Sequence, residues 1–226
     1  MYTIQKNLTK LNHNQPTNFL DPREQNLIKS KLAKNTYHIF SPYKDSEKVI
    51  FYKEKEPIIH LYEIKTKIPI RHQDILGTLF SLNISNEMFG DIIIKENKYY
   101  IYIQDIMKNY FEANFTKIKN SKIELEELSL DTLKNYEKKY ETIELIVSST
   151  RIDTVIATLI HTNRPTIKEK MKKKEILLNH NYLKSISYNL KPNDIFSIRK
   201  YGKFQYKEIM NTTKKNHYII KINKYI

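Results

Sequence analysis

The spacing of apolar and polar residues changes several times along this 226-residue chain, and each change predicts a different kind of element. Apolar residues alternate with polar ones, or run together briefly, where we predict strands. They recur every three or four positions where we predict helices. In the first half, the predicted strands span residues 37–40, 48–52, 58–64, 91–95, 99–103 and 122–128, and the predicted helices span 21–34, 72–82 and 105–118.

From residue 58 onward the predicted elements follow one another as strand, helix, strand, strand, helix and strand. The predicted order in the middle of the chain is therefore β-α-β-β-α-β. This is the order of the ferredoxin-like fold, which RNA-recognition domains also use. Glu96 and Asn97 join the two central strands in a tight turn, because asparagine tolerates a positive φ. We predict an N-terminal helical and hairpin region over 1–56, a middle domain over 57–128 and a linker over 129–147.

Two tyrosines of the middle domain are candidates for contact with bases. Tyr100 and Tyr102 lie two positions apart on one predicted strand, so their side chains share a face and could stack on nucleobases. The surrounding KYYIYIQ does not match the aromatic signature of that strand in RNA-recognition domains. Packing in the interior is the alternative, and the sequence leaves both open.

The helix expected over 21–34 has a well-marked start. Asp21 can cap it, Pro22 suits the first helical position, and Glu24 can reach back to the cap residue as in a capping box. The sequence therefore places one helix in the N-terminal region, followed by two short strands.

A further domain is predicted over residues 148–226. Its first helix has one apolar stripe, formed by Ile152, Val155, Ile156, Leu159 and Ile160. Thr150 is the expected N-cap, with Asp153 three residues later in a capping-box pattern. A second helix begins at Asn163, with Pro165 just inside it. Short strands follow over 175–179, 184–190 and 195–202.

The second helix carries a row of cations. Arg164, Lys168 and Lys172 recur every four residues, so their side chains lie along one face of the helix. Like charges at this spacing repel by about a few tenths of a kcal/mol per pair. Such a row is better explained if phosphates neutralise it, although an ordinary solvated helix face in a lysine-rich chain is the alternative.

The net charge of +14 is concentrated in the last third of the chain. Residues 148–226 contain 17 Lys and Arg against 5 Asp and Glu, a net charge of +12, while residues 1–147 carry 22 against 20. A biased genome composition would spread the lysines evenly, and here they are not spread evenly. The distribution therefore favours a polyanionic partner for the C-terminal domain.

Composition removes several other classes of function. There are no cysteines, which excludes disulfides, thiol catalysis and cysteine-based zinc sites. The three glycines are too far apart for a phosphate-binding loop, and no two histidines have the spacing of a helical metal site. We expect no cofactor, no metal and no catalytic residue. The apolar runs are too short to span a membrane and the N-terminus does not look like a signal peptide, so we expect a cytoplasmic protein without a membrane partner.

The C-terminal domain resembles the S4 RNA-binding domain, a small module of two helices on a sheet known as the α-L motif. Its R-L-D, S-R, V-x-V-N and G-D-x-I-x-V/I-R motifs are matched here by Arg151-Ile152-Asp153, Asn163-Arg164, ILLN at 176–179 and NDIFSIR at 193–199. Two positions depart from the pattern. Lys174 stands where the family commonly has glycine at the helix end, and Asn193 replaces the glycine of G-D. A lysine there has to accept a strained cap, unless the turn differs.

The resemblance extends over residues 17–208. FLDPREQ at 19–25, DILGTLFSLNISNEMFGDIII at 74–94, SSTRIDTVIA at 148–157 and SIRKYGKF at 197–204 together are similar to the YlmH family. This resemblance implies a non-enzymatic RNA-binding protein that docks on rRNA of the large ribosomal subunit in ribosome-associated quality control. It implies other quality-control factors as partners, and it leaves open whether tRNA is contacted. Carried over by position, and supplemented from charge, the RNA-binding candidates are Arg151, Arg164, Lys168, Lys170, Lys172, Lys173, Lys174, Asn179, Arg199, Lys200 and Lys203.

Two other functions stay open at this point. S4 domains are often attached to enzymes, and Arg151-Ile152-Asp153 superficially resembles the catalytic R-L-D of pseudouridine synthases, in which the aspartate acts on uridine. Helix capping explains Asp153 without chemistry. A cell-division-associated interaction protein is the other alternative, and it predicts an exposed apolar patch or sustained heptads.

Overall fold

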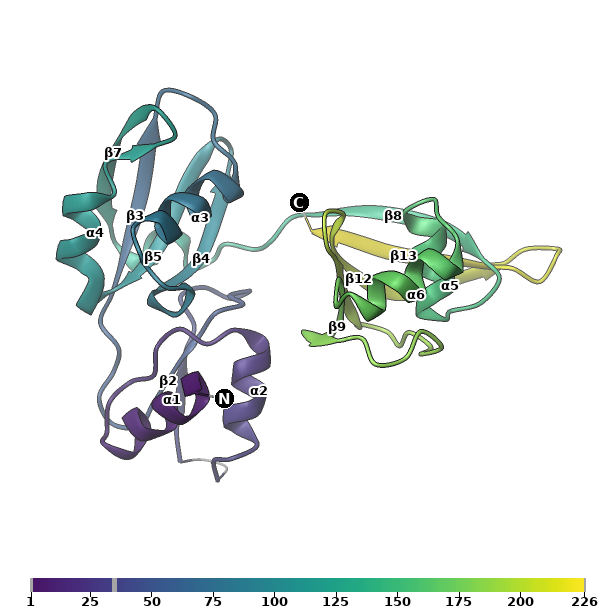
Figure 1. Cartoon of the computed structure of the whole chain (residues 1–226), viewed down its shortest axis with the longest axis horizontal. Helices are drawn as coiled ribbons and strands as arrows, with labels where there is room; N and C mark the ends of the chain where they lie inside the picture. Colours follow the sequence, from purple (N-terminus) through teal and green to yellow (C-terminus); the bar gives the residue numbers. More distant parts are fainter. Residues whose placement is uncertain (1, 34–35, 226) are drawn as a thin grey trace. The chain divides into compact units, whose positions relative to one another are not determined.

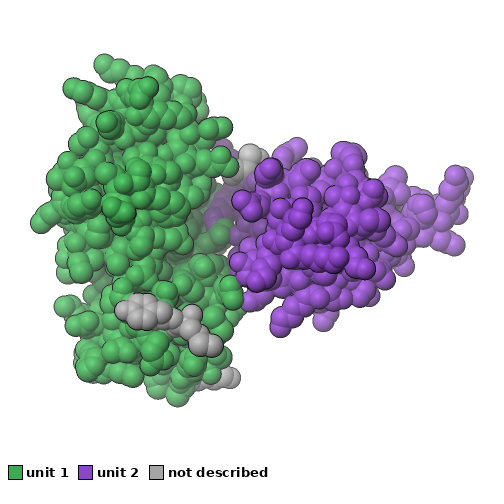
Figure 2. Space-filling model, viewed as in Figure 1, with its two compact units in different colours: residues 1–137 green, residues 138–226 purple. Residues whose placement is uncertain are grey.

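The computed structural model describes residues 2–33 and 36–225 and divides into two compact units, residues 1–137 and 138–226 (Figure 2). Both combine helices with antiparallel sheets (Figure 1). The helices are α1 (Tyr2–Asn12), α2 (Pro22–Lys29), α3 (His72–Ser81) and α4 (Lys108–Asn114) in unit 1, and α5 (Ile152–Leu159) and α6 (Arg164–Lys172) in unit 2. Short 3-10 helices are η1 (Asn86–Met88), η2 (Asp105–Met107) and η3 (Leu130–Leu133).

The strands follow the same division. Those of unit 1 are β1 (His38–Phe40), β2 (Ile50–Tyr52), β3 (Ile59–Thr66), β4 (Phe89–Lys95), β5 (Lys98–Gln104), β6 (Lys117–Ile118) and β7 (Ser121–Leu128). Those of unit 2 are β8 (Tyr140–Val147), β9 (Ile176–Leu178), β10 (Asn181–Tyr182), β11 (Ile195–Ile198), β12 (Gly202–Thr212) and β13 (Tyr218–Tyr225).

The central sheet of unit 1 has the order β4-β5-β3-β7-β6, and all its neighbouring strands are antiparallel. The predicted β-α-β-β-α-β order is present, with β6 inserted before the last strand. The predicted helix 105–118 is therefore wrong at its ends, since α4 is preceded by η2 and followed by β6. Side chains of α3 and α4, including Ile75 and Phe111, pack on one face of this sheet against residues such as Tyr62 and Ile101. Glu96 and Asn97 both have positive φ, as predicted for the tight turn between β4 and β5.

The opposite face of this sheet is covered by other parts of unit 1. Phe19, Tyr43 and Leu133 pack there against Tyr100 and Tyr102. A Cβ atom on the adjacent Gly90 would come within 2.9 Å of the Tyr102 Cβ and 3.0 Å of the Phe19 ring, so only glycine fits this contact. Tyr100 retains 6% of its exposed surface and Tyr102 none. The hypothesis that they stack on bases is wrong for this structure: they belong to the interior, which was the alternative.

The N-terminal region contains one more helix than predicted. Asp21 and Glu24 form the expected capping box at the start of α2, but the helix ends at Lys29. The unpredicted α1 buries Leu11 in a small core with Leu20 of the following segment. Strands β1 and β2, both predicted, pair as an antiparallel hairpin.

The segment 129–147, predicted as a linker, is mostly structured. Leu130 and Leu133 of η3 pack on the central core of unit 1. Strand β8 pairs with β13 along its whole length, from Tyr140 to Val147, and forms the edge of the sheet in unit 2. The sequence shows only a charged stretch here. In the structure its first part packs on unit 1 and its last part is a strand of unit 2.

Unit 2 is built on a six-stranded sheet of order β10-β9-β11-β12-β13-β8. Helices α5 and α6 cover one face, and the predicted stripe of α5 packs there through Ile152, Val155 and Ile156. The predicted strand 184–190 is absent, apart from a single bridge between Asn189 and Arg151. Strand β12 shares only Gly202 with the predicted strand 195–202, and β13 was not predicted. The two strands form the long hairpin visible in Figure 1.

Helix α6 ends in a left-handed turn at a lysine. Lys174 has φ of 57°, and its N–H donates to the carbonyl of Met171 at 2.9 Å. The next N–H, of Glu175, donates to the carbonyl of Lys170 at 2.9 Å, which completes a Schellman motif. The lysine therefore does accept the strained position that glycine usually fills. Asn193 likewise has a positive φ of 71°, as expected for the residue that replaces the second glycine.

Candidate nucleic-acid interface

Electrostatic charge differs sharply between the two units. Unit 2 contains 19 Lys and Arg against 7 Asp and Glu, a net charge of +12, while unit 1 contains 20 against 18. The carboxylates of unit 2 are too few to neutralise its cations. A folded surface with this excess attracts phosphates over distances of about a Debye length.

The row of cations on α6 is exposed. Arg164, Lys168 and Lys172 are all exposed, and their i, i+4, i+8 spacing places them along one flank of the helix. Asn163 fixes the start of the helix, because its side chain accepts the N–H of Thr166 at 2.9 Å. We call Arg164, Lys168 and Lys172 the helix patch.

Two members of the helix patch have partners at its ends. Lys172 pairs with Glu169 at 3.0 Å, an exposed contact worth little. The Arg164 guanidinium donates to the hydroxyl of Thr154 on the neighbouring α5. The arginine thus lies against α5 while half of its side chain, 52%, stays exposed.

Asp153 is a buried carboxylate that holds two arginines. Its side chain is 2% exposed and accepts hydrogen bonds from Arg151 Nε at 3.1 Å and Arg151 Nη2 at 2.9 Å. The Nε atom of Arg164 lies 3.9 Å from the same carboxylate. Both guanidinium groups therefore converge on one anion, which fixes their position beside the N-terminus of α6.

The expected capping arrangement of α5 is wrong by one residue. The N-cap is Arg151 rather than Thr150, and the cap has no side-chain hydrogen bond. The carboxylate of Asp153 instead accepts the N–H of Thr154 at 2.8 Å, in addition to the arginine contacts. Burial acts to raise the pKa of Asp153, but the hydrogen bonds and charge of Arg151 outweigh it and lower the pKa below the ordinary value. A carboxylate that is 2% exposed and already holds Arg151 is poorly placed to reach a uridine.

A second group of cations lies around the turn between β11 and β12. Lys170, on α6, pairs with Glu175 at 2.9 Å, and its ammonium lies 5.4 Å from the ring centroid of Tyr201. That hydrogen bond lowers the pKa of Glu175. Arg199 and Lys200, both exposed, precede Tyr201 in the turn. We call Lys170, Arg199, Lys200 and Tyr201 the turn patch.

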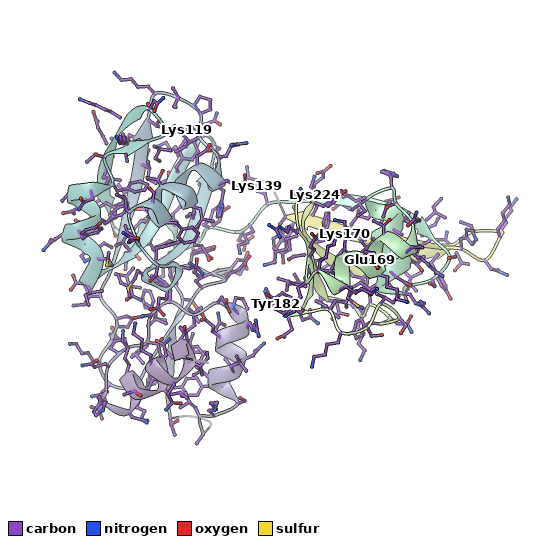
Figure 3. The ribbon with its side chains drawn as sticks, viewed as in Figure 1. Lys119, Lys139, Glu169, Lys170, Tyr182 and Lys224 are labelled. Atoms are coloured by element: carbon purple, nitrogen blue, oxygen red, sulfur yellow. The ribbon has the colours of Figure 1, made fainter. Side chains whose placement is uncertain are left out.

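The end of α6 adds two lysines beside the turn patch, and one of them lies next to a tyrosine of β10. Lys173 is exposed at the C-cap. The Lys174 ammonium lies 5.5 Å from the ring centroid of Tyr182 on β10. Arg199 is near, because its N–H donates to the carbonyl of Glu175 at 2.9 Å. Lys170 and Tyr182 are labelled in Figure 3.

Two predicted RNA contacts have other positions or partners. The Asn179 side chain donates to Asp194 at 2.8 Å and accepts the N–H of Ile195 at 2.9 Å, so it joins the end of β9 to the start of β11. Lys203 precedes the core residue Phe204 on β12 and so points to the sheet face away from α5 and α6. Its ammonium lies 4.9 Å from the ring centroid of Tyr225.

The cations predicted from the sequence therefore do not form one continuous row. The structure divides them between the helix patch with Arg151 beside it, the turn patch with Lys173 and Lys174, and the far sheet face with Lys203. Sequence reasoning missed the aromatic members of this surface, Tyr182 and Tyr201. The signal available was a tyrosine between cations in the RKYGK stretch, which is a pattern typical of nucleic-acid binding.

Unit 1 has a polar cavity of a different character. It has a volume of about 360 Å³ and is lined by Tyr62, Glu112, Phe115, Thr116, Ile123, Leu125 and Glu127. At its rim Glu127 accepts hydrogen bonds from Lys108 at 2.7 Å and contacts His60 at 2.6 Å. Within the described residues no group of three or more His, Asp or Glu side chains is arranged to hold a metal. The carboxylates of this cavity make it unsuited to phosphate.

None of the helices within 2–33 and 36–225 is both long and apolar enough to cross a membrane. The fold of unit 2 presents its excess positive charge on an exposed surface. A basic surface of this kind is typical of proteins that bind nucleic acids.

Comparison with known proteins gives this class a family. Residues 53–132 match the model described as the putative RNA-binding domain in YlmH. The chain is 24% identical over 213 residues to ribosome-associated protein quality control protein P2 of Bacillus subtilis (strain 168), with 88% of this chain and 83% of that protein covered. Both matches make the chain similar to the YlmH family.

Among solved structures, the chain is similar to the cell division protein ylmH from Streptococcus pneumoniae, at 24% sequence identity and a TM-score of 0.48, over 59% of this chain and 92% of that one. The segment that matches the family's RNA-binding model lies within unit 1. It contains 11 Lys and Arg against 13 Asp and Glu, a net charge of −2. The strongly basic unit 2 lies outside that match.

Proposed function

We propose that this protein binds rRNA of the large ribosomal subunit without catalysing a reaction, and that it acts in ribosome-associated quality control. The observation that carries the proposal is the net charge of +12 on unit 2, together with the exposed cations of the helix patch. The name of the Bacillus subtilis relative supports the ribosomal setting. Cytoplasmic location and other quality-control factors as partners belong to the same proposal.

We also propose a division of labour between the units. Unit 2, with two helices on one face of a sheet, is interpreted as an S4-type domain that grips phosphates of structured RNA. The sheet of unit 1 has a ferredoxin-like strand order, as in RNA-recognition domains, but its second face is covered and the matched segment is slightly acidic. Unit 1 would then act by a route other than base stacking on its sheet.

Affinity in this proposal comes chiefly from release of counterions and recognition from the shape of the RNA. Each phosphate contact adds roughly 0.7 to 0.9 to the slope of log affinity against log salt. The two arginines on Asp153 are pre-positioned, so less side-chain freedom is lost on binding. A planar guanidinium can also meet a phosphate with two hydrogen bonds.

The test is co-sedimentation of the full-length protein with purified large subunits. Replacing Arg164, Lys168 and Lys172 with alanine should abolish it. A matched control replaces three exposed lysines of unit 1, Lys95, Lys117 and Lys122, which removes the same charge. Binding lost with the first variant and kept with the control supports the proposal. Equal sedimentation of both variants with wild type would overturn the assigned surface.

Crosslinking in cells followed by sequencing of the attached RNA identifies the RNA. Recovery of large-subunit rRNA is expected. Recovery of tRNA in addition would establish the further contact with tRNA, and recovery of no RNA would contradict the proposed function. The enzyme alternative has its own assay: isomerisation of uridine by the purified protein that is lost in Asp153→Asn would revive it.

A further inference from the structure

Two tyrosines near the end of α6 are exposed and each lies beside a lysine. Tyr201 keeps 45% of its surface exposed, with the Lys170 ammonium 5.4 Å from its ring centroid. Tyr182 keeps 44%, with the Lys174 ammonium 5.5 Å away. Lys170 and Lys174 are four residues apart, so the same end of α6 supplies both cations. An aromatic ring beside a cation is a combination that nucleotides bind, since the base stacks and the phosphate pairs.

Tyr201 is held at the tip of a short hairpin. Its N–H donates to the carbonyl of Ile198 at 3.0 Å, and Ile198 pairs with Gly202 across the turn. Gly202 has φ of 117°, a conformation that side-chain-bearing residues rarely adopt, and this glycine allows the chain to re-enter β12. The ring is thus presented from a defined backbone, which lowers the entropy cost of ordering it on a ligand.

Lysines occupy two left-handed positions at this surface. Lys174 and Lys200 have φ of 57° and 73°, where glycine or asparagine would be less strained. The left-handed Lys119 of unit 1 differs, because its ammonium pairs with Asp74 at 2.8 Å inside that unit. A positive side chain at a strained position points to a use for the charge.

The chemistry of the surface selects its ligand. An apolar partner would gain little from Arg199, Lys200, Lys170 and Lys174, whereas a nucleotide uses both the rings and the charges. Paired bases inside an A-form helix do not offer their faces, but unpaired bases in loops and bulges do. The buried Tyr100 and Tyr102 of unit 1 lack this accessibility.

We propose that Tyr201, with Tyr182 as a second ring, forms a stacking site for unpaired nucleotides, next to the phosphate-binding helix patch. This inference rests on the proposed RNA-binding function and adds a specificity to it. The protein then distinguishes RNA that carries a bulge or loop from a fully paired helix, and it uses unit 2 for this distinction.

The experiment measures affinity of the full-length protein for two RNAs that differ only in one feature. One is a fully paired duplex, and the other is the same duplex with a short bulge of unpaired uridines. Tyr201→Leu keeps an apolar side chain of moderate size but removes the ring. Tyr201→Phe keeps the ring and is the matched control.

Wild type and Tyr201→Phe should prefer the bulged RNA. Tyr201→Leu should bind the bulged RNA about fivefold more weakly or worse, which is the lower end for loss of one base–aromatic stack, and bind the duplex as wild type does. The stacking site is overturned if the leucine variant binds the bulged RNA as tightly as wild type. It is also overturned if this variant loses the same affinity for both RNAs, or if Tyr201→Phe loses as much affinity for the bulged RNA as Tyr201→Leu does.

Failure of the underlying function has a separate readout. Alanine at all three helix-patch positions should weaken binding to both RNAs. If wild type binds neither RNA, RNA binding and the stacking site are both wrong. If wild type binds the duplex through the helix patch but Tyr201→Leu changes nothing, only the stacking site is wrong.

Discussion

The two units are built alike but use their polar residues differently. Each packs helices on one face of an antiparallel sheet. In unit 1 nearly every cation is balanced, and carboxylates such as Asp74 and Glu127 each receive two basic partners. In unit 2 the cations outnumber the carboxylates by 12, and the buried Asp153 serves to position arginines.

The segment that resembles a known RNA-binding domain is therefore not the part of the chain with the charge to attract RNA. The segment that matches the putative RNA-binding model has a net charge of −2, while the unit outside the match carries +12. The description of the matched model favours RNA binding by unit 1, whereas the net charge favours RNA binding by unit 2. Because counterion release dominates binding to nucleic acids, we expect the affinity to reside in unit 2.

The largest expected effect is a loss of stability in unit 1 that leaves RNA affinity unchanged. Tyr102→Ala removes a fully buried ring that stacks on Tyr43 with 6.1 Å between centroids. The free energy of unfolding of unit 1 should fall by about 3 to 5 kcal/mol. Hydrogen-exchange mass spectrometry measures each unit separately, and RNA affinity should stay at the wild-type value while unit 1 remains folded.

Tyr102→Phe is the control for this prediction. The Tyr102 hydroxyl is buried and has no hydrogen-bond partner within the described residues, so its removal should leave unit 1 as stable or more stable by about 1 kcal/mol. A fall in RNA affinity with this phenylalanine variant would contradict the assignment of Tyr102 to the interior.

The next effect concerns the buried anion of unit 2. Asp153→Ala leaves Arg151 and Arg164 without their shared partner. The cost should be about 2 kcal/mol, below that of a fully buried pair because the two guanidinium groups are 37% and 52% exposed. Thermal unfolding followed by exchange in unit 2 measures it. RNA affinity should fall as well, although no cation is removed, and unchanged affinity would show that arginine positioning is unimportant.

Acid pH should act on the same group. The pKa of Asp153 is lower in the folded protein than in the unfolded chain, where it is about 3.9. Its contribution to stability is therefore complete above about pH 4 and is lost as the pH falls through the folded pKa. Unit 2 of the wild type should lose stability over this range more steeply than unit 2 of Asp153→Asn, as measured by exchange at stepped pH. Equal slopes would contradict the prediction.

The smallest effect compares matching helix ends in the two units. Lys174 and Asn83 both occupy the left-handed position of a Schellman motif, with φ of 57° and 58°. Lys174→Gly should stabilise unit 2 by about 1 kcal/mol, and Asn83→Gly should stabilise unit 1 by less than about 0.5 kcal/mol, because asparagine tolerates this conformation better. Chemical denaturation measures both changes.

Lys174→Gly also tests function, because it should stabilise unit 2 and at the same time weaken RNA binding. If Lys174 contacts a phosphate, the salt slope of RNA binding should fall by roughly 0.7 to 0.9 while the protein becomes more stable. Unchanged binding would remove Lys174 from the interface. A gain in stability equal to that of Asn83→Gly would mean that the lysine is not strained.

Local signals in the sequence predicted local structure well. The capping box of Asp21 and Glu24, the turn at Glu96-Asn97 and the stripe of α5 all depend on residues close together in the chain, and each was confirmed. α1 was missed although Ile4, Leu8 and Leu11 have helical spacing, because the polar composition around them hid the pattern. The linker failed for another reason, since β8 is a strand only through its pairing with the distant β13.

For the candidate site, the sequence determined that the cations belong to the last third of the chain and that Arg164, Lys168 and Lys172 share one helical face. Both follow from composition and the period of the helix. Only the tertiary structure decided that Tyr100 and Tyr102 are buried, that Lys203 lies on another face, and that Asp153 joins Arg151 to Arg164. These outcomes depend on which distant segments cover a surface, and long-range packing leaves no periodic signal in a single sequence.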